Sequence, residues 1–104
     1  MNLIGNQMND KTICRLHARV TGRVQGVGFR YYVVSEAASF GLTGWVRNRR
    51  DGSVEVLAEG EKDKLTALVR ALKQGSRSSI VHEVKQEWLD ATAEFQGFSA
   101  RPTI

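Results

Sequence analysis

The chain has 104 residues, of which 41% are hydrophobic and 25% are charged, and its formal net charge at pH 7 is +4. These values are typical of one globular domain and exclude a low-complexity chain. No apolar run is long enough for a transmembrane helix. The first eleven residues lack the basic start and apolar core of a secretory signal. We therefore expect residues 1–11 to form a flexible polar lead-in, in which Met8 could be an alternative start, and residues 12–104 to form the domain.

The first half of the domain predicts a strand, a loop and a helix. Apolar and polar residues alternate over Cys14–Thr21, which predicts a half-buried strand. Three glycines in the next segment, Gly22–Arg30, predict a tight loop. From Tyr31 to Phe40 the apolar residues recur at helical spacing, and Gly41 is a natural helix stop.

A hairpin is predicted in the middle of the chain. Its first strand opens at Trp45 and runs to about Asn48, and Asp51-Gly52 supplies the turn. Its second strand covers Ser53–Glu59. The alternation places Glu55 and Glu59 on the polar face of that strand, where we expect both to be exposed.

The remaining segments predict a helix and two strands. A helix of about a dozen residues follows Gly60 and ends at Gly75. Its apolar stripe consists of Leu65, Leu68, Val69 and Leu72. A strand follows over Ile80–Leu89, and Phe95–Arg101 contains a short further strand. The order of elements predicts a ferredoxin-like α+β fold (βαββαβ), an antiparallel sheet with both helices on one face.

The glycine-rich loop is the main candidate for a binding site. It joins a strand to a helix start, where free backbone N–H groups can converge on an anion and glycines allow close approach. Arg30 ends the segment with a planar charged group that matches two phosphate oxygens. The loop lacks the third glycine of the dinucleotide fingerprint and the Gly-Lys-Ser/Thr ending of a P-loop. Glycine spacing alone leaves an anion cradle and an ordinary glycine-rich turn equally open.

Two segments carry a family resemblance. Gly22–Arg30, read as a string, resembles the first signature of the acylphosphatase family. Gly44–Asn48, followed by Asp51–Val56, resembles the second, in the same order and at similar spacing. The resemblance implies the same ferredoxin-like fold. It also implies hydrolysis of the carboxyl–phosphate bond of acyl phosphates to a carboxylate and inorganic phosphate, without a metal or another cofactor.

The resemblance also implies roles for individual residues. In the family, the arginine that ends the first signature binds the phosphate, and the asparagine of the second holds the attacking water. These roles fall on Arg30 and Asn48. The phosphate cradle falls on the backbone amides of Val24, Gln25, Gly26, Val27, Gly28 and Phe29. The chain departs from the family pattern after Gly75, where Ser76–Ser79 stands in place of the usual proline.

Other polar and aromatic residues have plainer interpretations. We expect His17 to be solvated on the polar side of its strand, and Arg47 and Arg49 to be solvated as well. Phe29 and Trp45 are interpreted as packing anchors and not as platforms for stacking bases.

The few cysteines and histidines indicate which cellular compartment to expect and whether a zinc site is possible. Cys14 is the only cysteine, so no internal disulfide can form, and no zinc spacing can be built from Cys14, His17 and His82. We therefore expect a reducing, cytoplasmic compartment.

Two rival functions fit part of the sequence. The fold order also occurs in RNA-recognition modules, and the chain is basic, but Ser53–Glu59 lacks the aromatic residues that such a module needs on its third strand. A non-catalytic acyl-phosphate-binding module at the front of a larger enzyme is the second rival. Because the chain ends at Ile104, we expect a stand-alone enzyme. We expect it to be monomeric, to act on small acyl phosphates, and to bind neither membrane nor nucleic acid.

Overall fold

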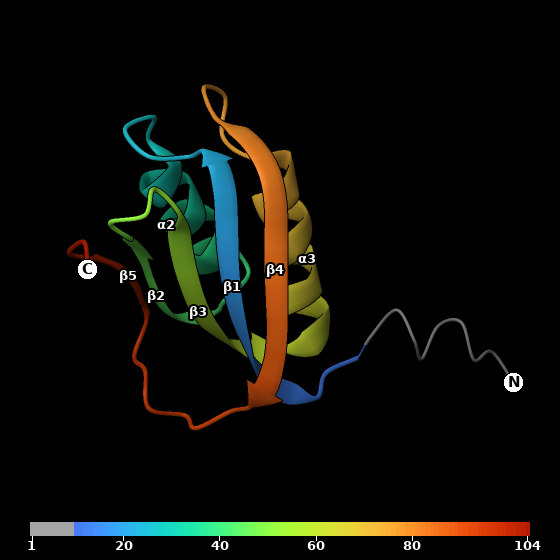
Figure 1. The fold of residues 1–104 in the computed structure, drawn as a ribbon. Coiled ribbons are helices and arrows are strands. Elements are labelled where there is room, and N and C mark those ends of the chain that lie inside the picture. The colour runs from blue at the N-terminus through green and yellow to red at the C-terminus, as the bar shows by residue number, and fades with distance from the viewer. Residues whose placement is uncertain (1–9) are drawn as a thin grey trace, which may run out of the picture.

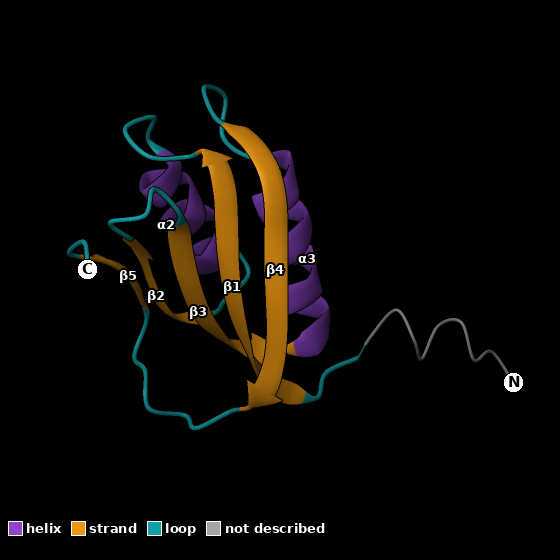
Figure 2. Cartoon of the chain, in the orientation of Figure 1, coloured by secondary structure: helices purple, strands orange, loops and turns teal. Residues whose placement is uncertain are grey.

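A five-stranded sheet with two helices packed on one face makes up residues 10–104, the part of the chain that the computed structural model describes (Figures 1 and 2). Residues 1–9, including Met8 and most of the expected lead-in, lie outside the described residues. The elements in chain order are β1 (Ile13–Arg23), α2 (Phe29–Ser39), β2 (Thr43–Asn48), β3 (Val54–Glu61), α3 (Lys62–Gln74), β4 (Ile80–Asp90) and β5 (Phe98–Arg101). The expected ferredoxin-like order of strands and helices is confirmed from β1 to β4.

The sheet is mixed, because its fifth strand is parallel to its neighbour. The strand order is β4-β1-β3-β2-β5. The pairs β1–β3, β1–β4 and β2–β3 are antiparallel as expected, whereas β2 and β5 are parallel. The chain leaves β4 at one edge of the sheet, crosses its lower end and returns beside β2 at the other edge (Figure 1). Strand β5 therefore runs in the direction of β2.

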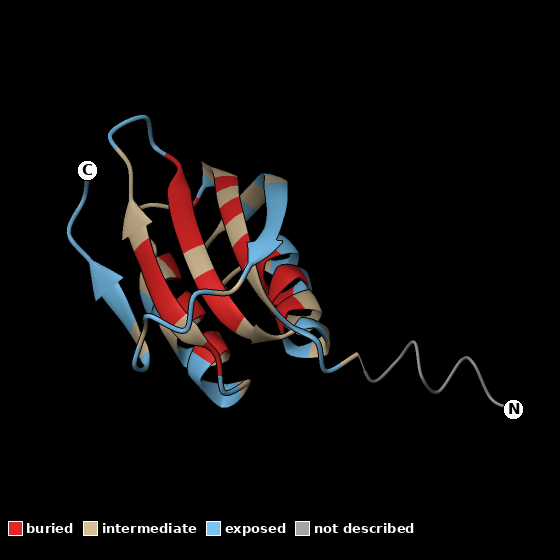
Figure 3. Ribbon diagram, turned by 90° about the horizontal axis from the view of Figure 1, so that it is seen from below, coloured by how far each residue is buried: buried red, intermediate tan, exposed pale blue. Residues whose placement is uncertain are grey.

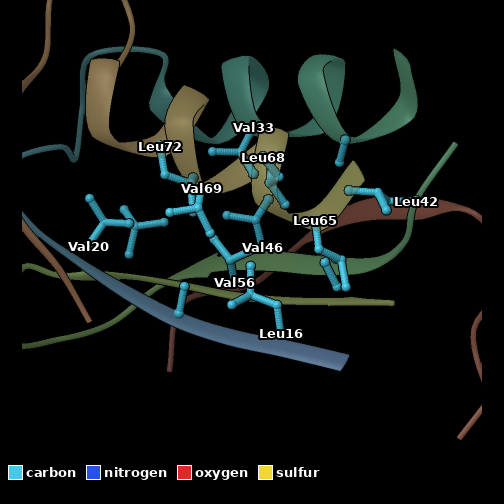
Figure 4. Packing of buried hydrophobic residues seen from close by; sticks show 14 of the residues in the cluster. Leu16, Val20, Val33, Leu42, Val46, Val56, Leu65, Leu68, Val69 and Leu72 are labelled. Carbon is cyan, nitrogen blue, oxygen red and sulfur yellow. The ribbon is translucent and has the colours of Figure 1, made fainter. Parts of the chain in front are cut away.

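The hydrophobic core lies between the sheet and the two helices (Figure 4). The predicted stripe of α3 is buried in full, and the inward residues of β1 and β3 face it. Buried and less buried positions alternate along β1, as its period-two pattern predicts (Figure 3). Burial of each such aliphatic side chain stabilises the fold by about 1.5–3 kcal/mol.

Helix α2 begins two residues earlier than expected, at Phe29 instead of Tyr31. Gly28 is the N-cap residue and has a φ of 75°, a left-handed conformation that glycine adopts without strain. The chain can therefore turn sharply at Gly28 and enter the helix at once. As a result, Arg30 lies in the first helical turn, not in the loop.

The prediction that Glu55 and Glu59 are exposed is wrong. Both belong to the sheet face opposite the helices, yet their exposed fractions are only 6% and 4%. Glu59 accepts hydrogen bonds from Arg15 Nε at 2.6 Å and from the backbone N–H groups of Thr92 and Ala93 at 2.9 Å. Burial alone would raise the pKa of Glu59, but these donors outweigh it and lower the pKa. Long basic side chains and the β4–β5 connection cover a face that the alternation pattern leaves open to water.

Candidate active site

The two signature segments meet at one depression of about 270 Å³. It lies where the β1–α2 loop approaches the end of β2. Its lining consists of Val24, Gly26, Gly28, Phe29, Arg30, Tyr31 and Asn48. Six of the eight predicted site residues are therefore in this lining. The other two, Gln25 and Val27, belong to the same loop but do not line the depression.

The loop presents a run of backbone N–H groups without protein acceptors. Tyr32 is the first residue of α2 whose backbone N–H donates a hydrogen bond, to the Gly28 carbonyl at 3.1 Å. Among residues 10–104, no acceptor is found for the N–H groups of residues 24–31. Gly26, with a φ of 72°, lets the loop turn within this run. Free amides at a helix start favour an anion at this end of α2.

Arg30 adds a full positive charge to the same place. Its side chain is partly buried, and its Nη1 donates to the Arg101 carbonyl at 3.4 Å. Within the described residues, no carboxylate lies at ion-pair distance from Arg30. Since guanidinium has five N–H donors, most of them remain available to a bound oxyanion.

Asn48 lies at the end of β2, on the side of the sheet that faces the helices. Val46, two residues earlier on that side, is fully buried in the core. The Asn48 side-chain oxygen Oδ1 is buried, and no group within residues 10–104 donates to it. A buried carbonyl oxygen without a donor is costly, so this oxygen is well suited to accept a hydrogen bond from a molecule in the depression.

The backbone of Asn48 is held by the last residue of the chain. The N–H of Ile104 donates to the Asn48 carbonyl at 3.1 Å, and the N–H of Arg50 donates to the Ile104 carbonyl at 2.9 Å. Sequence reasoning missed this contact, and nothing in the composition of the C-terminal segment signals it. It fixes Asn48 from the edge of the sheet.

Gln25 connects the loop to the hairpin that carries Asn48. Its side-chain Nε2 donates to the backbone carbonyls of Arg49 and Ser53 at 2.7 and 2.8 Å. The side chain of this residue is therefore a tether, while its predicted contribution to the cradle concerns only its backbone amide. Val27 packs against the core and anchors the loop from the other side.

A charged cluster on the reverse face of the sheet supports the strand that carries Asn48. Glu55 Oε1 accepts from Arg47 Nε at 2.8 Å and from Arg49 Nη1 at 2.9 Å, and Glu55 Oε2 lies 2.6 Å from His17 Nε2. Burial alone would raise the pKa of Glu55, but the hydrogen bonds from His17, Arg47 and Arg49 outweigh it and lower the pKa to about 2. The expectation that His17, Arg47 and Arg49 are solvated is therefore wrong.

The aromatic residues divide into two groups. Phe29 and Trp45 are buried, with exposed fractions of 1% and 7%, as expected for packing anchors. Tyr31 is 86% exposed and lines the depression beside Arg30, a position that sequence reasoning did not foresee. Its position directly after Arg30, the residue that ends the first signature, is the one signal that could have revealed it.

The described residues hold neither a cluster of metal ligands nor a helix that could span a membrane. Within residues 10–104, no three His, Cys, Asp or Glu side chains converge as metal ligands would. In the same part of the chain, no helix has the length and apolar composition to cross a membrane. Cys14 is half-buried, and burial raises the pKa of its thiol, which keeps it protonated and unreactive.

The fold and the depression together define a small α+β protein in which a loop with unbonded backbone N–H groups and an asparagine with an unpaired side-chain oxygen line one depression. The family model described as Acylphosphatase matches residues 16–100. Since this match covers most of the domain, the chain belongs to the acylphosphatase family.

Individual relatives agree with this assignment. An acylphosphatase of Salinibacter ruber is 47% identical over 94 residues, which cover 90% of this chain and 99% of that protein. The crystal structure of acylphosphatase from Bacillus subtilis superposes with a TM-score of 0.82 at 42% identity, covering 86% of this chain and 99% of that one. Full-length HypF, in a phosphate- and nucleotide-bound form, aligns with a TM-score of 0.80 at 26% identity over 89% of this chain but only 12% of HypF. The expected fold, hydrolase class and acylphosphatase activity are thereby confirmed.

Proposed function

We propose that the chain hydrolyses small acyl phosphates at this depression, with Arg30 and the loop amides holding the phosphate and Asn48 holding the attacking water. The observation that carries the proposal is the pairing of two unsatisfied sets of groups across one depression. The loop of residues 24–31 has N–H donors without acceptors. Asn48, whose Oδ1 is an acceptor without a donor, lines the same depression. A phosphate with an attacking water satisfies both sets at once.

The reaction needs little from the protein beyond charge and position. The leaving group is a carboxylate whose conjugate acid has a pKa of about 4, so it departs at neutral pH without a proton. Phosphoryl transfer passes through a loose transition state that demands little from the nucleophile. Arg30 and the amides stabilise the charge on the phosphoryl oxygens, and Asn48 orients the water.

The atoms balance without a side-chain base. The water oxygen forms a bond to phosphorus, the bond from phosphorus to the acyl oxygen breaks, and the carboxylate leaves with its electron pair. We assign the water proton to a phosphate oxygen of the substrate. This assignment rests on the lining of the depression, which contains no carboxylate or imidazole. His17 bonds to Glu55 on the other face of the sheet, and His82 is exposed on β4.

The rival of nucleic-acid binding loses its main support. On the open sheet face, Arg15 is engaged by Glu59, and Arg47 and Arg49 are engaged by Glu55. Phe29 and Trp45 are buried. Residues 12–104 are accordingly proposed as a monomeric acylphosphatase domain, with residues 1–11 as a lead-in. The single cysteine favours a cytoplasmic location.

One experiment tests whether the protein hydrolyses an acyl phosphate and which atom the water attacks. The protein is incubated with benzoyl phosphate in ¹⁸O-labelled water with a chelator present, and in parallel with an unactivated phosphate monoester. We expect rapid loss of benzoyl phosphate only, with the label in inorganic phosphate and none in benzoate. Label in benzoate would place the attack at the carbonyl carbon and contradict the mechanism, and loss of activity with chelator would contradict metal independence. Lack of any turnover would favour the binding-module alternative.

A further inference from the structure

A second depression, of about 330 Å³, adjoins the one that holds Asn48. It is lined by Arg30, Tyr31, Val34 and Ala100. Arg30 and Tyr31 line both depressions, so the two adjoin at these side chains. Val34 comes from the second turn of α2 and Ala100 from β5, the edge strand that runs beside β2 (Figure 1).

The walls of the second depression are mostly apolar. Tyr31 and Val34 are three residues apart on α2 and therefore share one face of the helix. Tyr31 is 86% exposed, so its ring is open to contact by a molecule in the depression. Arg30 is the only charged residue in the lining, and it faces the phosphate depression as well.

We propose that this second depression receives the acyl group of the substrate and selects apolar acyl groups of medium size, aliphatic or aromatic. The inference rests on the proposed function, because it starts from a phosphate bound at Arg30 and the loop amides. The acyl group is joined to that phosphate through one oxygen, so it must leave the first depression past a lining residue. Arg30 and Tyr31 mark the side on which open volume continues.

Size and charge define the substrate class further. A cavity of about 150 Å³ is enough to bind a benzene ring, so the second depression, of about 330 Å³, has room for a benzoyl or hexanoyl group. An acetyl or carbamoyl group would leave most of it empty. An acyl group with a second carboxylate would lose hydration there without gaining a cation, since Arg30 is engaged by the phosphate.

A chain-length series tests this inference. Acetyl, butyryl and hexanoyl phosphate have leaving carboxylic acids of nearly equal pKa, so their intrinsic reactivity hardly differs. We expect kcat/KM to rise with chain length, at most about fourfold per methylene, which is the fold-change for complete burial of one CH₂ group. Succinyl phosphate, which matches butyryl phosphate in length but carries a second carboxylate, should be roughly tenfold poorer.

Two variants assign the effect to the second depression. Val34→Thr keeps the shape of the side chain but adds a hydroxyl, and should flatten the series. Ala100→Leu fills the depression and should make hexanoyl phosphate poorer than butyryl phosphate. Both variants should leave inhibition by inorganic phosphate as in the unaltered protein, because phosphate has no acyl group to enter the second depression. The matched controls are Val84→Thr, half-buried on β4, and Ser99→Leu, the neighbour of Ala100 whose side chain belongs to the other face of β5.

The outcomes separate this inference from the function on which it rests. A flat series in the unaltered protein, with acetyl phosphate still hydrolysed, overturns the acyl subsite and leaves the acylphosphatase mechanism intact. Equal effects of Val34→Thr and Val84→Thr on the slope also overturn it. If no member of the series is hydrolysed, the proposed function falls first and the subsite falls with it.

Discussion

The side chain of Gln25 donates a hydrogen bond to the backbone carbonyl of Arg49 at 2.7 Å, and this contact joins the glycine-rich loop to the hairpin that carries Asn48. A second bond from the same amide group reaches the Ser53 carbonyl at 2.8 Å. The two halves of the site come from different strands, so a direct tether is needed to keep them in register. Gln25 supplies it from within the first signature.

Replacement of Gln25 by glutamate should therefore loosen the site. The new carboxylate has the same shape but no N–H to donate, and it faces two carbonyl oxygens that repel it. We expect kcat/KM for benzoyl phosphate to fall roughly tenfold or more, and the free energy of unfolding to fall by about 1–3 kcal/mol. Denaturant unfolding and steady-state kinetics measure both. Gln96→Glu, in the exposed β4–β5 connection, is the matched control, and an equal effect there would refute the tether.

Arg30→Lys tests whether the phosphate needs a planar charged group. Lysine keeps the charge but loses the paired N–H groups that match two oxygens. We expect kcat/KM to fall roughly 10²–10³-fold, with weaker competitive inhibition by inorganic phosphate. Arg23→Lys, an exposed residue of the same segment, should behave as the unaltered protein. Near-normal turnover in Arg30→Lys would show that charge alone suffices.

The lowered pKa of Glu55 makes the free energy of unfolding depend on pH in the acid range. Its pKa in the folded protein is about 2, below the ordinary value of 4.5. The unfolded chain therefore takes up the proton first as the pH falls. The stabilisation by Glu55 is complete above about pH 4.5 and is lost as the pH falls towards about 2, by at most about 3 kcal/mol.

Glu55→Gln is the variant that tests this dependence. It should lower the free energy of unfolding at pH 7 and show a weaker loss of stability between about pH 4.5 and 2. Urea unfolding at a series of pH values measures both quantities. Glu83→Gln, on an exposed position of β4, should keep the full acid dependence. If Glu55→Gln keeps it too, another carboxylate is responsible.

Removal of residues 102–104 should lower turnover without unfolding the domain. The backbone of Ile104 is hydrogen-bonded to Asn48 and Arg50. The Ile104 side chain does not belong to the core cluster. Loss of these two bonds frees the end of β2, so we expect a lower kcat and a nearly unchanged far-ultraviolet circular dichroism spectrum. The variant Ile104→Ala, which keeps the backbone, should retain activity. A truncated protein with full activity would show that β3 alone holds Asn48.

The order of elements and the core were predictable because they follow from periodicity. The stripe of α3 and the alternation in β1 depend on local spacing, which the sequence displays directly. The burial of Glu55 was not predictable, because its partners come from both neighbouring strands, His17 from β1 and Arg47 and Arg49 from β2 and its turn. The parallel pairing of β5 was missed for the same reason, since it results from a crossing of the whole sheet.

The candidate site was predictable in part. The resemblance named Arg30 and Asn48, and the structure brings both to one depression. The contacts that hold them, from Gln25 and Ile104, link segments far apart in the chain and leave no local pattern. The second depression is lined by residues of both α2, including Tyr31, and β5, so neither segment alone predicts it.

In the proposed mechanism, Asn48 positions the water and does not hold the phosphate, and Asn48→Ala tests this role most directly. Benzoyl phosphate turnover and competitive inhibition by inorganic phosphate are measured on the same preparation, with Gln86→Ala on the exposed part of β4 as control. We expect kcat to fall roughly 10²-fold or more while the inhibition constant for phosphate stays as in the unaltered protein. Retention of most of the activity, or a loss of phosphate binding in proportion to the loss of turnover, would contradict the account.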